Sequence, residues 1–189
     1  MTENCSRPSG LVQGDGASYT RGVFTRRCDQ AELESILADG TELIEHLDCR
    51  GRRLEGLDFS KRHLRWVRFT KTHFVNCRFD EAVLECVFAD FSVVDDSSFC
   101  DALIFESVFA GARMTRCSFT GVTGDQCNFN AIQAQEADFS DASLRRSRFI
   151  NARLTAVTFI NCDVRHALFQ FSERNEVSFK HTNNDEAFF

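Results

Sequence analysis

The chain has 189 residues and a formal net charge of -6, and 43% of its residues are hydrophobic and 26% charged. This length fits one domain with a sizeable core, and the composition excludes collagen, coiled coils and bulk disorder. No apolar run approaches the roughly 18 residues of a membrane-spanning helix, and a chain without a basic surplus is a poor ligand for nucleic acid. The sequence therefore predicts a soluble protein with no membrane partner and no direct nucleic-acid binding.

The first segment of the chain, residues 1–28, is polar and shows no periodicity, so we expect it to be disordered. Asp29 and Glu32 then have the spacing of a capping box, which marks the start of a helix. One apolar helical face follows, made of Leu33, Ile36 and Leu37. We expect residues 29–43 to hold a short helix that caps the domain that follows.

The rest of the chain, residues 44–189, is dominated by a repeat of five residues. Phe stands at every tenth position from Phe59 to Phe189 except at Ala89. Halfway between these positions stands a central residue that is mostly aliphatic, such as Leu54, and a small or β-branched residue precedes each central residue by two. A period of five fits neither a helix nor a strand, so each five residues must form a short extended stretch and then turn a corner.

Four such corners close a square coil of 20 residues, in which the Phe residues divide between two opposite walls. One wall carries Phe59, Phe79, Phe99, Phe119, Phe139, Phe159 and Phe179. The opposite wall carries Phe69, Ala89, Phe109, Phe129, Phe149, Phe169 and Phe189. Large rings from two walls and aliphatic groups from the other two would fill a narrow interior, as close packing requires. Gly124 is the one glycine among the central residues, and we expect a hole there the size of a Leu side chain.

This pattern resembles the pentapeptide-repeat family, whose motif is a small residue, then Asp or Asn, then Leu or Phe. The residues that carry the resemblance most closely are Ala137, Asp138, Phe139, Ala142, Leu144, Cys127, Asn128 and Phe129. The resemblance implies an all-β fold, a right-handed quadrilateral parallel β-helix whose coils are joined by backbone hydrogen bonds. Residues 44–189 would then form about seven coils.

The cysteines indicate packing rather than chemistry. There are nine, an odd number with no CxxC pair, which predicts reduced thiols and a cytoplasmic location, with disulfides as the alternative. Four of them occupy the small inward position, where we expect buried hydrophobes rather than metal or redox ligands: Cys77, Cys117, Cys127 and Cys162.

The motifs of enzymes are missing from the sequence. It contains no glycine-rich phosphate loop, no HExxH motif and no nucleophile elbow. His63 and His73 lie ten residues apart, which is half a coil, so they emerge from opposite walls and cannot share a metal ion. We therefore expect no catalysis, no cofactor and no metal site.

Charge is divided unevenly along the chain. Residues 50 to 78 hold nine basic and two acidic residues, whereas residues 80 to 106 hold eight acidic residues and no Lys or Arg. Such runs are either solvated surface or a polarised surface for a partner, and the sequence leaves both open.

Large apolar residues at outward positions gather in the same region. They are Val83, Leu103 and Phe105 on one wall and Phe88, Phe91 and Val108 on the next. Exposed groups of this kind mark interaction sites, although Phe88 or Phe91 could instead turn inward to replace the ring missing at Ala89. We predict a partner-binding surface that combines these six residues with five carboxylates: Asp90, Asp95, Asp96, Asp101 and Glu106.

The C-terminal end of the repeat has no predicted capping helix, and the pattern decays at Arg174 and Asn184. Either the chain continues in a longer protein, or the last coil stacks on another chain. On the second interpretation we predict a homodimer formed through Phe179, Phe188 and Phe189.

Three functions are compatible with these features. The first is a rigid, non-catalytic protein-protein interaction module with an unidentified protein partner. The second follows from the resemblance, because members of this family that inhibit or protect DNA gyrase imitate DNA in width and negative charge. This chain departs from that pattern, since residues 49–189 hold 19 acidic and 18 basic residues. The third is a secreted bacterial effector, with which a polar N-terminal segment is compatible.

Overall fold

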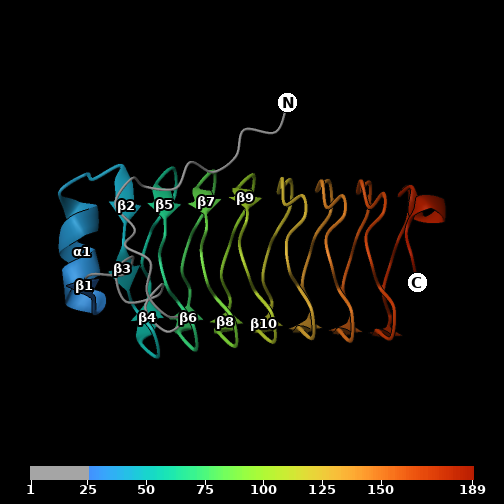
Figure 1. Ribbon diagram of the computed structural model, residues 1–189, viewed down its shortest axis with the longest axis horizontal. Coiled ribbons are helices and arrows are strands. Elements are labelled where there is room, and N and C mark those ends of the chain that lie inside the picture. The colour runs from blue at the N-terminus through green and yellow to red at the C-terminus, as the bar shows by residue number, and fades with distance from the viewer. Residues whose placement is uncertain (1–25) are drawn as a thin grey trace, which may run out of the picture.

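The structure is a computed structural model and describes residues 26–189. These residues form a four-sided solenoid of parallel β-strands with one helix across its N-terminal end (Figure 1). Residues 1–25, which make up most of the segment predicted to be disordered and support the effector hypothesis, lie outside the described residues. No helix within residues 26–189 is long and apolar enough to cross a membrane.

Two opposite walls of the solenoid are β-sheets. Wall A is a seven-stranded sheet of β4 (Arg53–Glu55), β6 (His73–Val75), β8 (Val93–Asp95), β10 (Arg113–Thr115), β11 (Gln133–Gln135), β12 (Arg153–Thr155) and β13 (Glu173–Asn175). Wall C is a four-stranded sheet of β2 (Leu43–Glu45), β5 (His63–Arg65), β7 (Val83–Glu85) and β9 (Leu103–Phe105). Wall B follows wall A in each coil, and wall D follows wall C. Within each of these two walls, successive coils are joined by single parallel bridges, such as Asp58 to Arg78 in wall B and Arg68 to Phe88 in wall D.

Partners in neighbouring coils of these walls are 20 residues apart, as between Leu54 and Phe74 in wall A. This register confirms the predicted quadrilateral β-helix. The solenoid has about eight turns rather than about seven. The extra turn begins before residue 44, because β1 (Arg26–Arg27) pairs in parallel with β3 (Leu47–Asp48). The last residues of the segment predicted to be disordered are therefore part of the solenoid, and Cys28 is buried.

The α-helix α1 (Gln30–Ala38) begins at the predicted capping box, and a short 3-10 helix, η1 (Asn184–Glu186), lies near the other end of the described chain. The Asp29 side chain accepts a hydrogen bond from the Glu32 backbone N–H at 3.1 Å, and the Glu32 side chain accepts one from the Asp29 N–H at 3.0 Å. Arg62, a basic residue at an inward position of the repeat, reaches the other end of the helix. Its guanidinium donates to the carbonyls of Gly40 at 3.0 Å and Leu37 at 3.4 Å, which secures α1 to the first coils.

The core consists of two columns of Phe rings, as the spacing predicts. Rings on one wall stack along the axis, for example Phe79 on Phe99 with centroids 4.6 Å apart and planes 2° from parallel. Rings from walls B and D meet edge to face, as Phe119 and Phe129 do at 6.4 Å and 83°. Both arrangements are favourable for the aromatic quadrupole, so each ring is held by neighbours within and between coils.

The small inward residues also join the coils by hydrogen bonds, a role that the sequence did not indicate. The Ser147 hydroxyl accepts from the Cys127 N–H at 3.0 Å and donates to the Gly124 carbonyl at 2.6 Å. The Cys127 thiol points to the Ile104 carbonyl at 3.3 Å. Burial raises the pKa of Cys127 to about 12, so this thiol stays protonated at neutral pH. The eight cysteines among residues 26–189 are free thiols.

The interior defect lies at Ala89 and not at Gly124. A Cβ at Gly124 would lie 3.3 Å from Val122 and 3.4 Å from Leu144, so neighbouring side chains already fill the predicted hole. At Ala89 a cavity of ≈ 10 Å³ remains, lined by the surrounding Phe rings. Phe74, a ring at a normally aliphatic position, lines this cavity and occupies part of the missing volume.

The corners of the coil place every fifth residue in the left-handed backbone region. The residues there include many that are not glycine, such as Ala131 with φ 55° and Phe91 with φ 55°. Gly111 occupies one of these corners with φ 66°, and an added Cβ there would lie 2.7 Å from the Phe91 ring. Space rather than conformation therefore favours glycine at position 111, because an added Cβ would force the Phe91 ring to move.

Candidate interaction surface

Five of the six predicted apolar residues lie on walls C and D, which join at the corner that holds Glu106. Val83 pairs with Leu103, and Phe105 follows one residue beyond Ile104 in β9. Phe88 and Val108 are bridged partners on wall D. Leu103 is 44% exposed and Phe105 39% exposed, so the pleat directs both away from the core. We call this set, Val83, Phe88, Leu103, Phe105 and Val108, the apolar corner.

Phe91 belongs to a different edge. It occupies the corner between walls D and A, is 60% exposed, and packs its ring over Gly111. Phe88 keeps the regular bridge register with Arg68 and Val108 and points outward. The alternative that one of these rings turns inward at Ala89 is therefore wrong.

The predicted carboxylates are not all near the apolar corner. Glu106 lies at the corner itself, between Phe105 and Val108, and Asp101 lies at the start of wall C beside Leu103. Asp90 precedes Phe91 on wall D. Two others, Asp95 and Asp96, stand at the end of β8 in wall A, on the opposite side of the solenoid. The structure therefore separates these two from the predicted partner surface.

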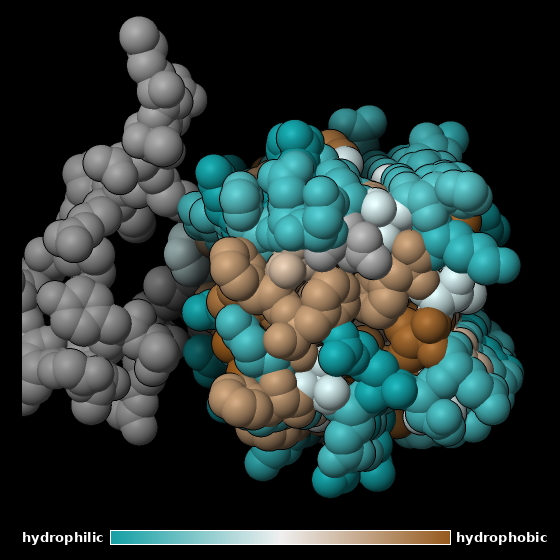
Figure 2. Space-filling model, turned by 90° about the vertical axis from the view of Figure 1, so that its right-hand side faces the viewer, coloured by the Kyte–Doolittle hydropathy of each residue, from teal (hydrophilic) through white to brown (hydrophobic). Residues whose placement is uncertain are grey.

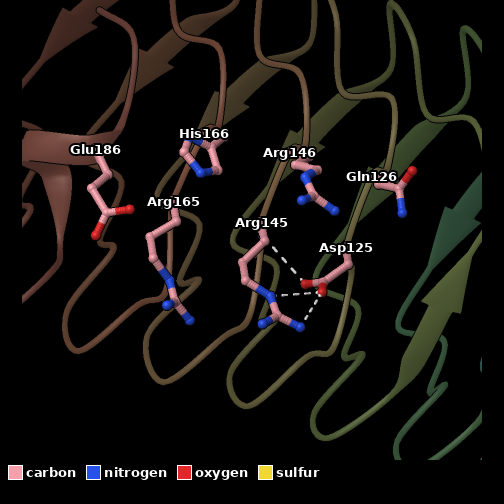
Figure 3. A pocket seen from close by; sticks show the side chains of 7 residues that line it. All are labelled: Asp125, Gln126, Arg145, Arg146, Arg165, His166 and Glu186. Atoms are coloured by element: carbon pink, nitrogen blue, oxygen red, sulfur yellow. Dashed lines mark hydrogen bonds and ion pairs between the residues drawn. The ribbon is translucent and has the colours of Figure 1, made fainter.

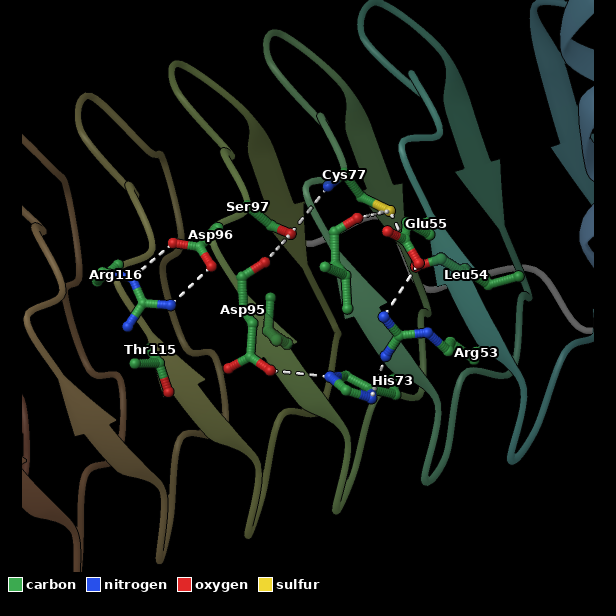
Figure 4. Close-up of polar contacts among 12 residues, drawn as sticks. Arg53, Leu54, Glu55, His73, Cys77, Asp95, Asp96, Ser97, Thr115 and Arg116 are labelled. Carbon is green, nitrogen blue, oxygen red and sulfur yellow. Dashed lines mark hydrogen bonds and ion pairs between the residues drawn. The ribbon is translucent and has the colours of Figure 1, made fainter.

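The basic and acidic runs of the sequence are partly paired with each other in space. They lie about one coil apart, so the 20-residue register places side chains of one run beside carboxylates of the other, and Arg78 also pairs with a carboxylate of its own coil. The ion pairs join Lys61 to Glu81 at 3.5 Å, Arg78 to Asp80 at 3.2 Å and, from beyond the basic run, Arg116 to Asp96 at 2.6 Å. The His63 and His73 rings contact Glu85 and Asp95, each at 2.8 Å. Figure 4 shows the pairs on wall A, where Arg53 also contacts the His73 ring at 3.1 Å.

These pairs leave three of the eight carboxylates in residues 80 to 106 without a cationic partner among the described residues: Asp90, Asp101 and Glu106. Asp90 accepts a hydrogen bond from the Thr70 hydroxyl at 2.8 Å, and Glu106 contacts the Cys86 thiol at 3.3 Å. In contrast, the Arg116 guanidinium holds the pKa of Asp96 below its usual value. The uncompensated negative charge thus lies next to exposed apolar side chains.

The C-terminal end of the described chain exposes the interior of its last coil. Figure 2 looks at this end and shows apolar side chains gathered in its middle within a hydrophilic rim. Phe188 is 50% exposed and Phe189 46% exposed, whereas Phe179 is half-buried. The Arg174 guanidinium, at a central position of the repeat, lies 4.7 Å from the centre of the Phe189 ring. The predicted self-association residues therefore do lie together.

The histidines lie as predicted, with His63 in β5 of wall C and His73 in β6 of wall A. Within residues 26–189 no group of three or more His, Cys, Asp or Glu side chains could hold a metal ion. A polar pocket that was not predicted from the sequence lies further along wall C. Its residues come from four successive coils, and the signal that could have found it is the stacking of residues 20 positions apart.

Comparison with known proteins agrees with this architecture. A sequence model described as the pentapeptide repeat region matches residues 112–189. No curated protein matches the sequence. Among solved structures, QnrB1, a plasmid-mediated fluoroquinolone resistance protein, shares 13% identity over 87% of this chain and 74% of its own, with a TM-score of 0.39.

Two cyanobacterial structures are also similar. HetL of Nostoc sp. strain PCC 7120, a pentapeptide repeat protein involved in heterocyst differentiation regulation, shares 12% identity over 85% of this chain and 96% of its own, with a TM-score of 0.34. Rfr23 of Cyanothece 51142 shares 11% identity over 75% of this chain and 90% of its own, with a TM-score of 0.27. The match to the pentapeptide repeat region covers residues 112–189, and the 20-residue coils show that the same repeat runs through the rest of the solenoid.

Proposed function

We propose that this chain is a rigid interaction module that presents the apolar corner to a protein partner. The observation that carries the proposal is the exposure of Leu103 and Phe105 on a wall whose backbone is fixed by the coils on both sides. A rigid surface loses little conformational entropy on binding, so apolar contacts at such a surface yield affinity efficiently.

The charges beside the apolar corner indicate the chemistry of the partner. Glu106 and Asp101 carry negative charge that no cation compensates within the described residues. A partner with an apolar centre and a basic rim is complementary to this arrangement, because rim charges direct encounter while the apolar centre supplies affinity.

Quantitative capture of partners from native lysate tests this proposal. Phe105→Ser should remove the bound partner, whereas Phe171→Ser, which changes a Phe that is 85% exposed in another part of the solenoid, should leave it bound. Glu106→Gln should slow association and reduce its salt dependence, and Asp95→Asn on the opposite wall should change neither. An identical set of bound proteins for wild type and Phe105→Ser would contradict the proposal.

DNA mimicry directed at DNA gyrase is the second candidate, and the uncompensated carboxylates Asp90, Asp101 and Glu106 favour it. The Lys and Arg partners of Glu81, Asp80 and Asp96 weaken it, because they compensate part of the negative charge. A supercoiling assay with purified gyrase separates the two candidates: a mimic loses its effect on gyrase when Asp101 and Glu106 become Asn and Gln, and keeps it in Phe105→Ser. No effect of the wild-type protein on gyrase would refute this second candidate.

We also propose that the exposed last coil mediates self-association. Phe189 and Phe188 present an apolar surface, and a second copy of the chain would bury it. Light scattering at increasing concentration should show a dimer that Phe189→Asp weakens. A wild-type protein that stays monomeric at high concentration would contradict the homodimer.

A further inference from the structure

The polar pocket lies on wall C, where the regular sheet ends. Beyond β9 wall C continues only as single bridges, which join Leu103 to Thr123, Thr123 to Ser143 and Ser143 to Asp163. The residues that follow Thr123, Ser143 and Asp163 form turns. A pocket of ≈ 250 Å³ opens over these turns (Figure 3). It is lined by Asp125, Gln126, Arg145, Arg146, Arg165, His166 and Glu186.

Two of the arginines in the pocket are fixed by carboxylates. Asp125 accepts from Arg145 Nε at 2.9 Å and from the Ser143 hydroxyl at 2.7 Å. Asp163 accepts from Arg165 Nε at 2.9 Å and from Arg165 Nη2 at 2.6 Å. The Nη1 groups of both arginines make no hydrogen bond within the described part of the chain. Both guanidiniums are thus held in place, and each keeps donors for a ligand.

The third arginine, Arg146, has no hydrogen bond or ion pair to any side chain that the structure describes. It stands at a corner with φ 57°, one coil before His166 with φ 59°, so the two side chains follow each other along the pocket edge (Figure 3). Of the two carboxylates that line the pocket, Asp125 is engaged by Arg145, and Glu186, at the far end of the pocket, makes no ion pair with the residues that the structure describes. The middle of the pocket therefore offers cationic donors that its own carboxylates do not satisfy.

We propose that this pocket binds a phosphate-type oxyanion, either free or as the phosphoryl group of a small molecule. Guanidinium forks match the oxygens of such an anion, and three of them with a neighbouring imidazole suit a doubly charged group better than a single carboxylate. The volume of the pocket fits a small ligand, and the fixed Arg145 and Arg165 lower the ordering cost of binding. The site begins one coil beyond the apolar corner, so its test is independent of the protein partner.

Arg146→Gln is the informative variant, because it removes the arginine that has no structural partner. Arg113→Gln is the matched control: Arg113 is also exposed and unpaired among the described residues, but it lies in β10 on wall A. Inorganic phosphate and phenyl phosphate are titrated into each full-length protein by calorimetry at low ionic strength in a phosphate-free buffer. Thermal unfolding checks that both variants remain folded.

We expect wild type and Arg113→Gln to bind with the same affinity, and Arg146→Gln to bind at least tenfold more weakly. Tighter binding of phenyl phosphate would identify a phosphomonoester as the ligand, and equal or tighter binding of inorganic phosphate would identify the free anion. Failure of the wild-type protein to bind either probe overturns the proposal. So does an equal loss in Arg113→Gln, because that would show a general effect of net charge rather than a site.

Discussion

The most specific prediction about the core concerns Phe74 and Ala89, a large ring and a small side chain that line the same cavity. Rings along a column elsewhere lie 4.6 Å to 5.5 Å apart, so a Phe at position 89 would stack between Phe69 and Phe109. Phe74 already meets the Phe69 ring with centroids 5.0 Å apart and borders the remaining cavity of ≈ 10 Å³. That cavity is about the size of one water molecule and too small for a benzyl group.

Ala89→Phe should therefore overpack the core and lower the free energy of unfolding by about 1–3 kcal/mol. Phe74→Leu removes part of a ring from the same space and should cost about 0.5–3 kcal/mol as a single change. The double variant replaces the missing ring and makes room for it. We expect its loss to be smaller than the sum of the single losses by at least about 1 kcal/mol, a coupling typical of residues in contact.

Urea unfolding followed by circular dichroism measures all four proteins, with the denaturant slope as a check that the unfolding reaction is the same in each. Losses that add within about 0.5 kcal/mol would refute the coupling. A single variant Ala89→Phe as stable as wild type would also refute it, because the ring would then have found space that the structure does not contain.

Three further changes test other parts of the repeat by the same urea measurement. Ala131→Gly should raise stability by about 0.5–1 kcal/mol, because an L-residue with φ 55° is strained and glycine is not, and a loss would contradict this account of the corners. Ser147→Ala should cost about 1–3 kcal/mol, since it leaves the buried Cys127 N–H without its acceptor, and a neutral result would refute the hydrogen-bonding role of the small inward position. Phe119→Ala should cost about 3–5 kcal/mol and the exposed Gln133→Ala less than about 0.5 kcal/mol, and equal losses would contradict the inward and outward assignment.

The fold could be predicted from the sequence because one physical rule is repeated at every coil. A Phe at each tenth position leaves only one way to close the chain into a packed square, so the two ring columns and the capping box of α1 follow from spacing alone. Arg62 shows the limit of that rule. It breaks the pattern at an inward position, and its role as a cap on α1 depends on where the helix lies and not on the repeat.

The surface was harder to predict, because its properties depend on neighbours 20 residues away. The basic and acidic runs look polarised along the chain, yet Lys61 beside Glu81 and Arg116 beside Asp96 show that neighbouring coils compensate part of this charge. Asp95 was assigned to the partner surface by its position in the sequence and lies on the opposite wall. A comparison of charged residues 20 positions apart, instead of residues that follow one another in the sequence, predicts both the ion pairs and the polar pocket.

Asp163 links the ion pairs of this surface to the acid stability of the fold. Hydrogen bonds from Arg165, together with one from Asn183 at 3.0 Å, hold the pKa of Asp163 well below its usual range, although partial burial opposes this shift. The ionised carboxylate therefore stabilises the fold above the unfolded-state pKa of about 3.9, and its contribution is lost as the pH falls from that value towards the lower folded-state pKa.

Because Asp163 is partly exposed, this contribution should be of the order of 1 kcal/mol at pH 7. Asp163→Asn removes both the charge and its titration, so the stability difference from wild type should be full above about pH 5 and narrow steadily below pH 4. The matched control is Asp39→Asn, which removes an exposed carboxylate that has no ion pair among the described residues. A wild-type to Asp163→Asn difference that stays constant from pH 7 to pH 2 would show that ionisation of Asp163 does not stabilise the last coils. The fixed position of the Arg165 guanidinium beside the pocket would then need an explanation other than its ion pair with Asp163.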